Sequence, residues 1–316
     1  MKETLLCCRI AAQEKGLYRL CHDGVEQAAQ VSGKFQYEAL GPSDYPTVGD
    51  EVLADLNGGG QAVIHKVLPR KSLFLRKAAG TAREEQPVAA NVDILFLCMA
   101  LNNDFNLRRL ERYLAAAWNS GATPVVVLTK ADLCGNPSEK VAAVEEAAPG
   151  TDVLLTSAAQ EGGIRPLLPY LTPGRTVAFV GSSGVGKSTL MNGLLGKEIL
   201  ATGGLRNDDR GRHTTTRRQM FFLPGGAALI DTPGMRELGL WDSESGLETA
   251  FADIEALARQ CRFQDCRHEK EPGCAVRAAL ASGELSEERF RSWQRLSAEN
   301  RYADDRAAHM SAKEKK

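Results

Sequence analysis

A glycine-rich loop between an apolar strand and a helix most constrains the fold of this chain. Residues 181–189 have the sequence GSSGVGKST, which matches GxxxxGK followed by Ser or Thr. The loop directly follows TVAFV and opens TLMNGLLG. In that context the backbone N–H groups turn inward around a phosphate, and the helix N-terminus adds a positive dipole. The sequence therefore predicts a nucleotide phosphate site on an α/β sheet; a chance glycine-rich turn is the alternative.

This loop and one further strand end supply the predicted phosphate and magnesium contacts. Lys187 should reach the β- and γ-phosphates, and the Ser188 hydroxyl should bind Mg²⁺. The strand AALI ends at DTPG, where the Asp231 carboxylate can hold Mg²⁺ through water and the Gly234 N–H can contact the γ-phosphate. The predicted phosphate-contacting residues are Gly181, Ser182, Ser183, Gly184, Val185, Gly186, Lys187, Ser188, Thr189 and Gly234.

Two other strand ends indicate a guanine base. TKAD follows PVVVL, and a Ser-Ala pair follows TDVLL. In GTPases the corresponding tetrad is Asn-Lys-x-Asp, whose Asp accepts two hydrogen bonds from guanine that adenine cannot donate. Thr129 replaces the Asn and reaches less far, so we expect a reduced nucleotide affinity. The predicted base-contacting residues are Thr129, Lys130, Ala131, Asp132, Ser157 and Ala158.

The base-contacting segments precede the phosphate loop, although in most GTPases they follow it. This order is a circular permutation, and it preserves the site because the same strand ends still meet at one edge of the sheet. One consequence is that the segment after DTPG leads straight into the C-terminal part of the chain. A γ-phosphate-dependent shift of that segment could therefore pull on the C-terminal part.

The 316 residues divide into three regions, which agrees with two or three domains. Residues 1–80 contain short runs that predict strands of a small all-β barrel, at residues 16–20, 34–40, 48–56 and 60–68. Residues 86–240 alternate strand and helix patterns, which predicts a parallel α/β sheet covered on both faces. Residues 241–316 have helical spacing around a Cys/His cluster and predict a mainly helical domain.

Charge and hydropathy exclude several classes of protein. The chain has 39 basic and 40 acidic residues, which argues against a globally basic nucleic-acid binder but allows local basic surfaces. The longest apolar run, residues 94–101, is far shorter than the roughly 18 residues of a spanning helix. The N-terminal apolar part is too short for a secretory signal. We therefore expect a cytoplasmic protein, and a monomer, because nothing demands a dimer.

Three of the eight cysteines lie close to a histidine in the sequence. Cys261, Cys266, His268 and Cys274 offer three thiolates and one imidazole, a complete tetrahedral set for Zn²⁺. Four protein ligands leave no open position, so the site would be structural. The alternative is buried free cysteines beside a surface histidine, because the spacing lacks the common CxxC pair.

A basic stretch follows the predicted barrel strands. Five basic residues fall within twelve positions without an intervening acid: Lys66, Arg70, Lys71, Arg76 and Lys77. They predict either a face that contacts RNA phosphates or a solvated strand edge and linker.

The permuted order, the barrel and the Cys/His cluster together resemble the ribosome small subunit-dependent GTPase A family, RsgA or YjeQ. TVGDEV and VLPRKSLFLRK are similar to that family's barrel and exit strand, and GRHTTTR is similar to its switch segment. The resemblance covers almost the whole chain. It implies an OB-fold, a permuted GTPase domain and a zinc-binding domain. It also implies binding to the small ribosomal subunit late in its maturation, with GTP hydrolysis stimulated by the subunit.

The polar stretch 201–219 predicts a mobile loop that carries the switch. Thr215 or Thr216 could ligate Mg²⁺ when the γ-phosphate is present, but a β-prone run into the next strand explains these threonines equally well. No glutamine follows DTPG to orient water. The resemblance offers His213 for that task, since histidine exchanges protons near neutral pH; a solvated or RNA-contacting side chain is the alternative. We expect slow unaided turnover.

Three functions fit these patterns to different degrees. The favoured one is a GTPase, activated by the small ribosomal subunit, that binds rRNA through the barrel, the basic stretch and the C-terminal domain. A GTP-dependent RNA clamp with little hydrolysis is the alternative. A P-loop kinase would need no base-contacting set of this kind and would prefer ATP.

Overall fold

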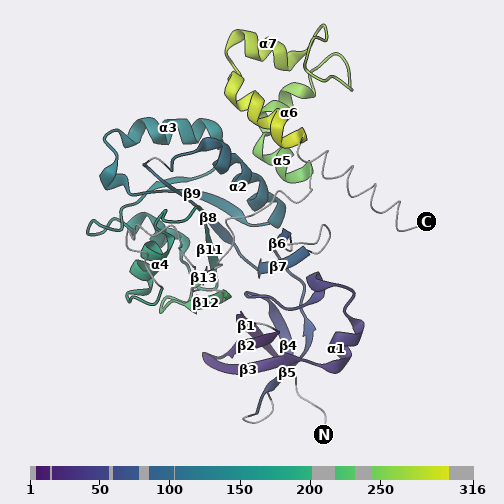
Figure 1. Ribbon diagram of the computed structural model, residues 1–316, viewed down its shortest axis with the longest axis vertical. Helices are drawn as coiled ribbons and strands as arrows, with labels where there is room; N and C mark the ends of the chain where they lie inside the picture. Colours follow the sequence, from purple (N-terminus) through teal and green to yellow (C-terminus); the bar gives the residue numbers. More distant parts are fainter. Residues whose placement is uncertain are drawn as a thin grey trace, which may run out of the picture.

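The computed structural model describes residues 5–14, 16–56, 60–77, 85–102, 104–200, 218–231 and 244–298. Figure 1 shows three parts stacked along the long axis, with a barrel at one end, an α/β sheet in the middle and a helical part at the other end. The predicted fold class is confirmed. The predicted domain boundaries stay predictions, because residues 78–84 and 232–243 lie outside the described part of the chain.

Five strands close into the N-terminal barrel. β1 (Leu6–Glu14), β2 (Leu17–His22) and β3 (Val25–Val31) form an antiparallel meander, and β3 pairs parallel with β5 (Ala62–Val67). β4 (Glu51–Asp55) pairs with both β5 and β1, which closes the ring. The side chains that point into the barrel are apolar and buried, and they include Ile10, Leu20, Val52 and Ile64. This five-stranded closure is the predicted OB-type barrel.

The strand predicted at residues 34–40 is wrong, because the chain forms helix α1 (Gly33–Glu38) there. The Ser32 hydroxyl accepts a hydrogen bond from the Phe35 N–H at 3.1 Å and caps the helix. Lys34 and Glu38 then form an ion pair at 3.7 Å across one helical turn. No residue of α1 is buried, so the alternating apolar pattern does not mark a buried strand face.

The central sheet has the order β10-β9-β8-β11-β13-β12. β8 (Ile94–Ala100), β9 (Thr123–Thr129), β10 (Val153–Leu155), β11 (Thr176–Val180) and β13 (Ala228–Asp231) are parallel, and β12 (Arg218–Phe222) is antiparallel to β13. Every residue of β8 is buried, as expected for a strand covered on both faces. The predicted parallel α/β sheet is therefore confirmed.

Helices cover both faces of this sheet and separate two apolar cores. α2 (Leu107–Ser120) and α3 (Pro137–Ala147) cover one face, where Leu95 and Leu97 point. α4 (Lys187–Leu195) covers the other, where Phe96 and Phe179 contact each other edge to face at 5.1 Å between ring centroids. Figure 1 shows α3 and α4 on opposite sides of the strands. Successive side chains of these buried strands enter the two cores alternately, and the carboxyl ends of the strands carry the candidate site.

The C-terminal part packs on α2 through a buried arginine. It comprises α5 (Glu244–Ala250), α6 (Ala252–Ala258), α7 (Ala275–Ser282) and a helix over residues 287–298. Arg289 donates to Asp253 of α6 at 2.7 Å and to the Ala147 carbonyl of α3 at 2.9 Å, and lies 3.6 Å from Glu111 of α2. One guanidinium thus joins the two parts. No helix in the described ranges is long and apolar enough to cross a bilayer.

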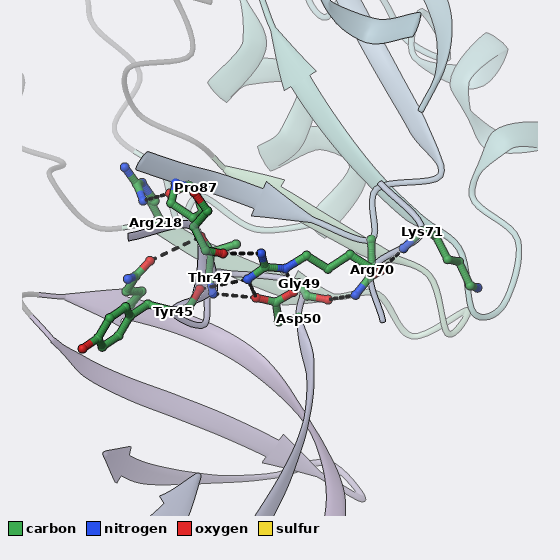
Figure 2. Close-up of polar contacts among 11 residues, drawn as sticks. Tyr45, Thr47, Gly49, Asp50, Arg70, Lys71, Pro87 and Arg218 are labelled. Carbon is green, nitrogen blue, oxygen red and sulfur yellow. Dashed lines mark hydrogen bonds and ion pairs between the residues drawn. The ribbon is translucent and has the colours of Figure 1, made fainter. Parts of the chain in front are cut away.

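The barrel is hydrogen-bonded to the central sheet at its β12 edge. β1 pairs antiparallel with β12, with Ala12 opposite Gln219 and Gln13 opposite Arg218. Figure 2 shows the adjoining polar network, in which the buried Asp50 carboxylate accepts from the Thr47 N–H and from two nitrogens of Arg70, all at 2.8 Å. The Arg218 guanidinium donates to the Pro87 carbonyl at 2.5 Å. The barrel and the central sheet are therefore joined at this edge by both backbone and side-chain hydrogen bonds.

Gly49 lies where the backbone of the barrel passes close to the backbone at Ala90. Its φ is +93°, and a Cβ at this position would lie 2.1 Å from the Ala90 carbonyl oxygen, which belongs to β7 (Glu85–Ala90). We expect Gly49→Ala to lower the free energy of unfolding by about 3 kcal/mol, because backbone strain adds to a clash that rigid backbone cannot relieve. Denaturant unfolding measures this loss.

Gly24→Ala is the matched control for this prediction. Gly24 also has a positive φ of +77°, but a Cβ there would meet nothing within 4 Å. The control should lose only about 1 kcal/mol from backbone strain. Equal losses in the two variants would contradict the close-contact argument.

Candidate nucleotide site and metal centre

The phosphate loop lies between β11 and α4 at the carboxyl edge of the central sheet. Gly181 begins the loop at a place where a Cβ would lie 2.4 Å from the Cys98 carbonyl oxygen of β8, so no side chain fits. The Lys187 ammonium donates to the carbonyls of Gly181 and Ser182 at 2.6 and 2.7 Å. The loop therefore wraps around a positive charge, which is the arrangement that a phosphate-binding loop needs.

Asp231 ends β13 next to this charge. Burial raises the pKa of the Asp231 carboxyl, and the neighbouring Lys187 ammonium acts in the opposite direction. Ser188 and Thr189 lie in the first turn of α4, directly after Lys187. A carboxylate and hydroxyls at the end of a phosphate loop form a donor set that suits Mg²⁺. The predicted magnesium residues Ser188 and Asp231 thus lie at the same edge of the sheet.

The predicted base-contacting segments lie at the ends of β9 and β10. Asp132 lies in the short 3₁₀ helix η3 (Ala131–Leu133), and its carboxylate accepts from the Ser157 hydroxyl at 2.5 Å. This contact joins the two base-contacting segments, which are 25 residues apart in sequence. It fixes one carboxylate oxygen of Asp132.

Thr129 ties the base-contacting segment to the phosphate loop. Its buried hydroxyl donates to the Val185 carbonyl at 2.6 Å, across 56 residues of sequence. The lower nucleotide affinity expected for this Asn replacement stays a prediction. The contact nevertheless places the base-contacting and phosphate-contacting segments in one continuous site.

Asp104 is a polar residue of this site that the sequence analysis missed. It follows β8, accepts a hydrogen bond from the Ser182 hydroxyl of the phosphate loop, and pairs with Arg109 of α2 at 2.9 Å. Its signal was the polar run NNDFN directly after a buried strand, at the edge where ligands bind in open α/β sheets. Asp104 therefore links the phosphate loop to α2.

Several predicted site residues lie outside the described residues. These are His213, Thr215, Thr216 and Gly234. Their predicted roles stay predictions.

The residues of the basic stretch differ in their exposure and in their contacts. Lys66 and Lys71 are exposed, whereas Arg70 holds Asp50 and the carbonyls of Ser43 and Tyr45. Arg70 thus has a structural role at the barrel junction. Strand β6 (Leu73–Lys77) contains Arg76 and Lys77, whose side chains are not described. RNA binding by these residues stays a prediction.

The Cys/His cluster is brought together in the C-terminal part. The ligand atoms of Cys261, Cys266, His268 and Cys274 all lie within 4.8 Å of one another. The Cys261 and Cys274 sulfurs are 3.8 Å apart, and the His268 Nδ1 is 3.6 and 3.4 Å from them. Sulfurs about 2.3 Å from one tetrahedral ion are about 3.8 Å apart, so the donor set fits a bound metal ion.

We expect Thr129→Val to raise the dissociation constant for guanine nucleotides roughly tenfold, because the buried Val185 carbonyl would lose its hydrogen-bond donor. Thr129→Ser keeps the hydroxyl and should stay within about twofold of the parent chain. Titration with a fluorescent GDP analogue measures both, and thermal unfolding checks that both variants fold. Equal affinities for the two variants would show that the contact does not order the site.

We expect the purified chain to carry about one metal ion, which Cys261→Ser should remove together with part of the stability of the C-terminal part. Cys7→Ser changes an exposed cysteine of the barrel and is the matched control. Elemental analysis and thermal unfolding measure the two effects. A Cys261→Ser chain with full metal content would refute the ligand set.

Comparisons with known proteins agree with this geometry. The RsgA GTPase family model matches residues 67–241. A Lactiplantibacillus plantarum protein named Small ribosomal subunit biogenesis GTPase RsgA 2 is 50% identical over 93% of this chain and 83% of its own length. A Methanosarcina acetivorans protein named Small ribosomal subunit biogenesis GTPase RsgA is 45% identical over 97% of this chain and 82% of its own length.

Two solved structures share the whole arrangement. YjeQ from Thermotoga maritima aligns with a TM-score of 0.72 at 28% identity, over 94% of this chain and 99% of that chain. YloQ, described as a circularly permuted GTPase, aligns with a TM-score of 0.68 at 23% identity over 94% of this chain and 96% of that chain, a likeness of fold alone. Because the family model matches residues 67–241 and a relative is 50% identical over 93% of this chain, the chain belongs to the RsgA GTPase family.

Proposed function

We propose that this GTPase acts in the late maturation of the small ribosomal subunit, that the subunit stimulates its GTP hydrolysis, and that it binds ribosomal RNA. The observation that carries the proposal is the continuous site in which Thr129 joins the base-contacting segment to the phosphate loop. The names of the relatives, which refer to biogenesis of the small ribosomal subunit, support the choice of partner. The same partner favours a cytoplasmic location, and we propose a monomer.

Each part of the site has a proposed task in converting GTP and water to GDP and phosphate. Asp132 accepts hydrogen bonds from the guanine edge, and the Lys130 stem packs against the plane of the base. A backbone N–H of the loop at Ser157 and Ala158 donates to the guanine oxygen. The Lys187 ammonium leaves the loop carbonyls for the β- and γ-phosphates. Ser188 and Asp231 hold Mg²⁺, with Thr215 or Thr216 added when the γ-phosphate is present. Mg²⁺ would supply charge stabilisation at the transferring phosphoryl group.

His213 is the proposed water-orienting residue. The support is indirect: Met235, Arg236 and Glu237 follow the DTPG motif, so the position used by glutamine in many GTPases is not available for that role. We propose that turnover without a partner is slow, and that contact with ribosomal RNA places His213 for water activation and so accelerates hydrolysis.

The metal cluster has a proposed structural role as a Zn²⁺ site. Three thiolates and one imidazole complete a tetrahedron and leave no position for substrate. We further propose that residues 1–80, 86–240 and 241–316 act as the RNA-binding barrel, the GTPase domain and the zinc-binding domain.

Phosphate release with GTP or ATP, each with and without purified small subunits, tests this function. We expect GTP alone to be hydrolysed slowly, subunits to raise the rate by about tenfold or more, and ATP to give no response. The His213→Ala chain should bind GTP normally and lose most of the rise.

The outcomes separate the competing functions. Binding to subunits without a change in rate would favour the GTP-dependent RNA clamp. A preference for ATP would favour a P-loop kinase. A His213→Ala chain with full stimulation would remove that residue from the proposed mechanism.

A further inference from the structure

Two helices from different parts of the chain border a small, strongly basic groove. One rim is formed by Arg108 and Arg112 of α2, and the other by Arg291 and Arg295 of the helix over residues 287–298. The groove encloses about 60 Å³. It lies on the α2 face of the central sheet, whereas the nucleotide site lies at the carboxyl edge of the strands.

The spacing of the arginines is regular on both rims. Arg108 and Arg112 are four residues apart, as are Arg291 and Arg295, so each pair lies on one helix face about 6 Å apart along the axis. Arg108, Arg291 and Arg295 are exposed. Four guanidinium groups in two rows, one on each helix, match a ligand with repeated negative charges better than they match a single small anion.

Acidic side chains near these charges in the described part of the chain are Glu111, Glu287 and Glu288, and Glu288 lies close enough to Glu111 to raise its pKa. Glu111 at the base of the groove is buried, burial raises the pKa of its carboxyl, and it lies 3.6 Å from Arg289. Glu287 pairs with Arg291 at 3.2 Å, but both side chains are about two-thirds exposed, so the pair contributes little and a phosphate can replace it. The whole chain carries a formal net charge of -1, so the basic groove is a local concentration of charge.

We propose that this groove binds the phosphodiester backbone of ribosomal RNA, an inference that rests on the proposed function. Arginine presents a planar fork of donors that matches phosphate oxygens in a bidentate manner. A strand bound along the groove would contact α2 and the helix over residues 287–298 at once. RNA bound there would therefore hold the C-terminal part against the central sheet, independently of the barrel and its basic stretch.

The groove also lies next to a contact of the phosphate loop. Arg108 precedes Arg109, whose guanidinium pairs with Asp104 at 2.9 Å, and Asp104 accepts from the Ser182 hydroxyl. RNA bound on the first turn of α2 would thus lie beside a series of two side-chain contacts, Arg109–Asp104 and Asp104–Ser182, that ends at the phosphate loop. This path gives the subunit a second route to the GTPase site besides the switch.

The double variant Arg108→Gln/Arg295→Gln tests the proposal by removing one charge from each rim. Its binding to purified small subunits is measured across a series of KCl concentrations. Two lost phosphate contacts should lower the slope of log K against log salt by about two and weaken binding roughly tenfold or more at low salt. GTP binding and turnover without subunits should not change.

Arg165→Gln/Arg175→Gln is the matched control. Both arginines are exposed and lie away from the groove: Arg165 begins η4 (Arg165–Tyr170), and Arg175 directly precedes β11. The control variant therefore removes the same total charge as the groove variant. The proposal requires that this control keep the salt slope of the parent chain. If the salt slope changed equally in the two double variants, the loss would reflect total charge alone, and the proposed RNA site would be overturned.

The remaining outcomes are also decisive. Parent-like subunit binding by the groove variant would overturn the groove as an RNA site, even if the variant had lost binding to inorganic polyphosphate. A parent chain that binds no subunits would instead refute the proposed function. Arg108→Lys/Arg295→Lys, which keeps the charge but loses the planar fork, should recover the salt slope and only part of the affinity.

Discussion

Parallel hydrogen bonding between β8, β11 and β13 is the constraint on which the rest of this molecule depends. Val177 of β11 lies opposite Ile94 of β8 and Leu229 of β13, so the three strands run in the same direction and their carboxyl ends lie at the same edge of the sheet. That common end places the phosphate loop, Asp104 and Asp231 at one edge. Circular permutation changes the order in which the chain visits these strands but leaves the edge intact. The site therefore follows from the ladder of the sheet, whatever the connections between its strands.

Local patterns predict much of this structure. The apolar run around β8, the helical spacing of α2 and the phosphate loop depend on neighbours in sequence, and each has the structure that its pattern indicates. The Cys/His cluster was also predictable, because its four members fall within fourteen residues and share one chemistry. In contrast, the alternating pattern of residues 34–40 indicated a strand, and the cap from Ser32 favours a short helix instead.

Contacts over long sequence distances could not be predicted in the same way. Arg70 belonged to a basic stretch by composition, but its partner Asp50 is fixed only when β4 and β5 pair in the barrel. In the sequence Thr129 is only a departure from the Asn of the motif, and its hydrogen bond to the Val185 carbonyl, 56 residues away, is seen only in the structure. Asp104 carried no motif at all. These residues depend on tertiary partners, and a single sequence contains no signal for a partner whose distance along the chain is arbitrary.

A buried charge helps to organise the C-terminal part. Arg289 binds two carboxylates and two carbonyls, and its guanidinium lies 4.8 Å from the centre of the Phe251 ring. Replacing one partner of such a network leaves other buried charge uncompensated, which costs several kcal/mol. The same interactions have strict geometry, so they fix the orientation of α6 against α2 and α3. The metal ligands then hold the segment between α6 and α7, where few apolar side chains are available.

The pairing of β12 with β1 has a consequence for how this molecule can be divided. In a free α/β domain β12 would be an outer strand with a row of unsatisfied backbone donors and acceptors, a known template for aggregation. Here the barrel occupies that row, so it serves as a protective cover as well as a module of its own. Cutting the chain between the barrel and the central sheet would expose the backbone donors and acceptors of β12, and the isolated nucleotide-binding part would tend to self-associate. The barrel therefore covers the outer strand of the central sheet and protects it from pairing with another chain.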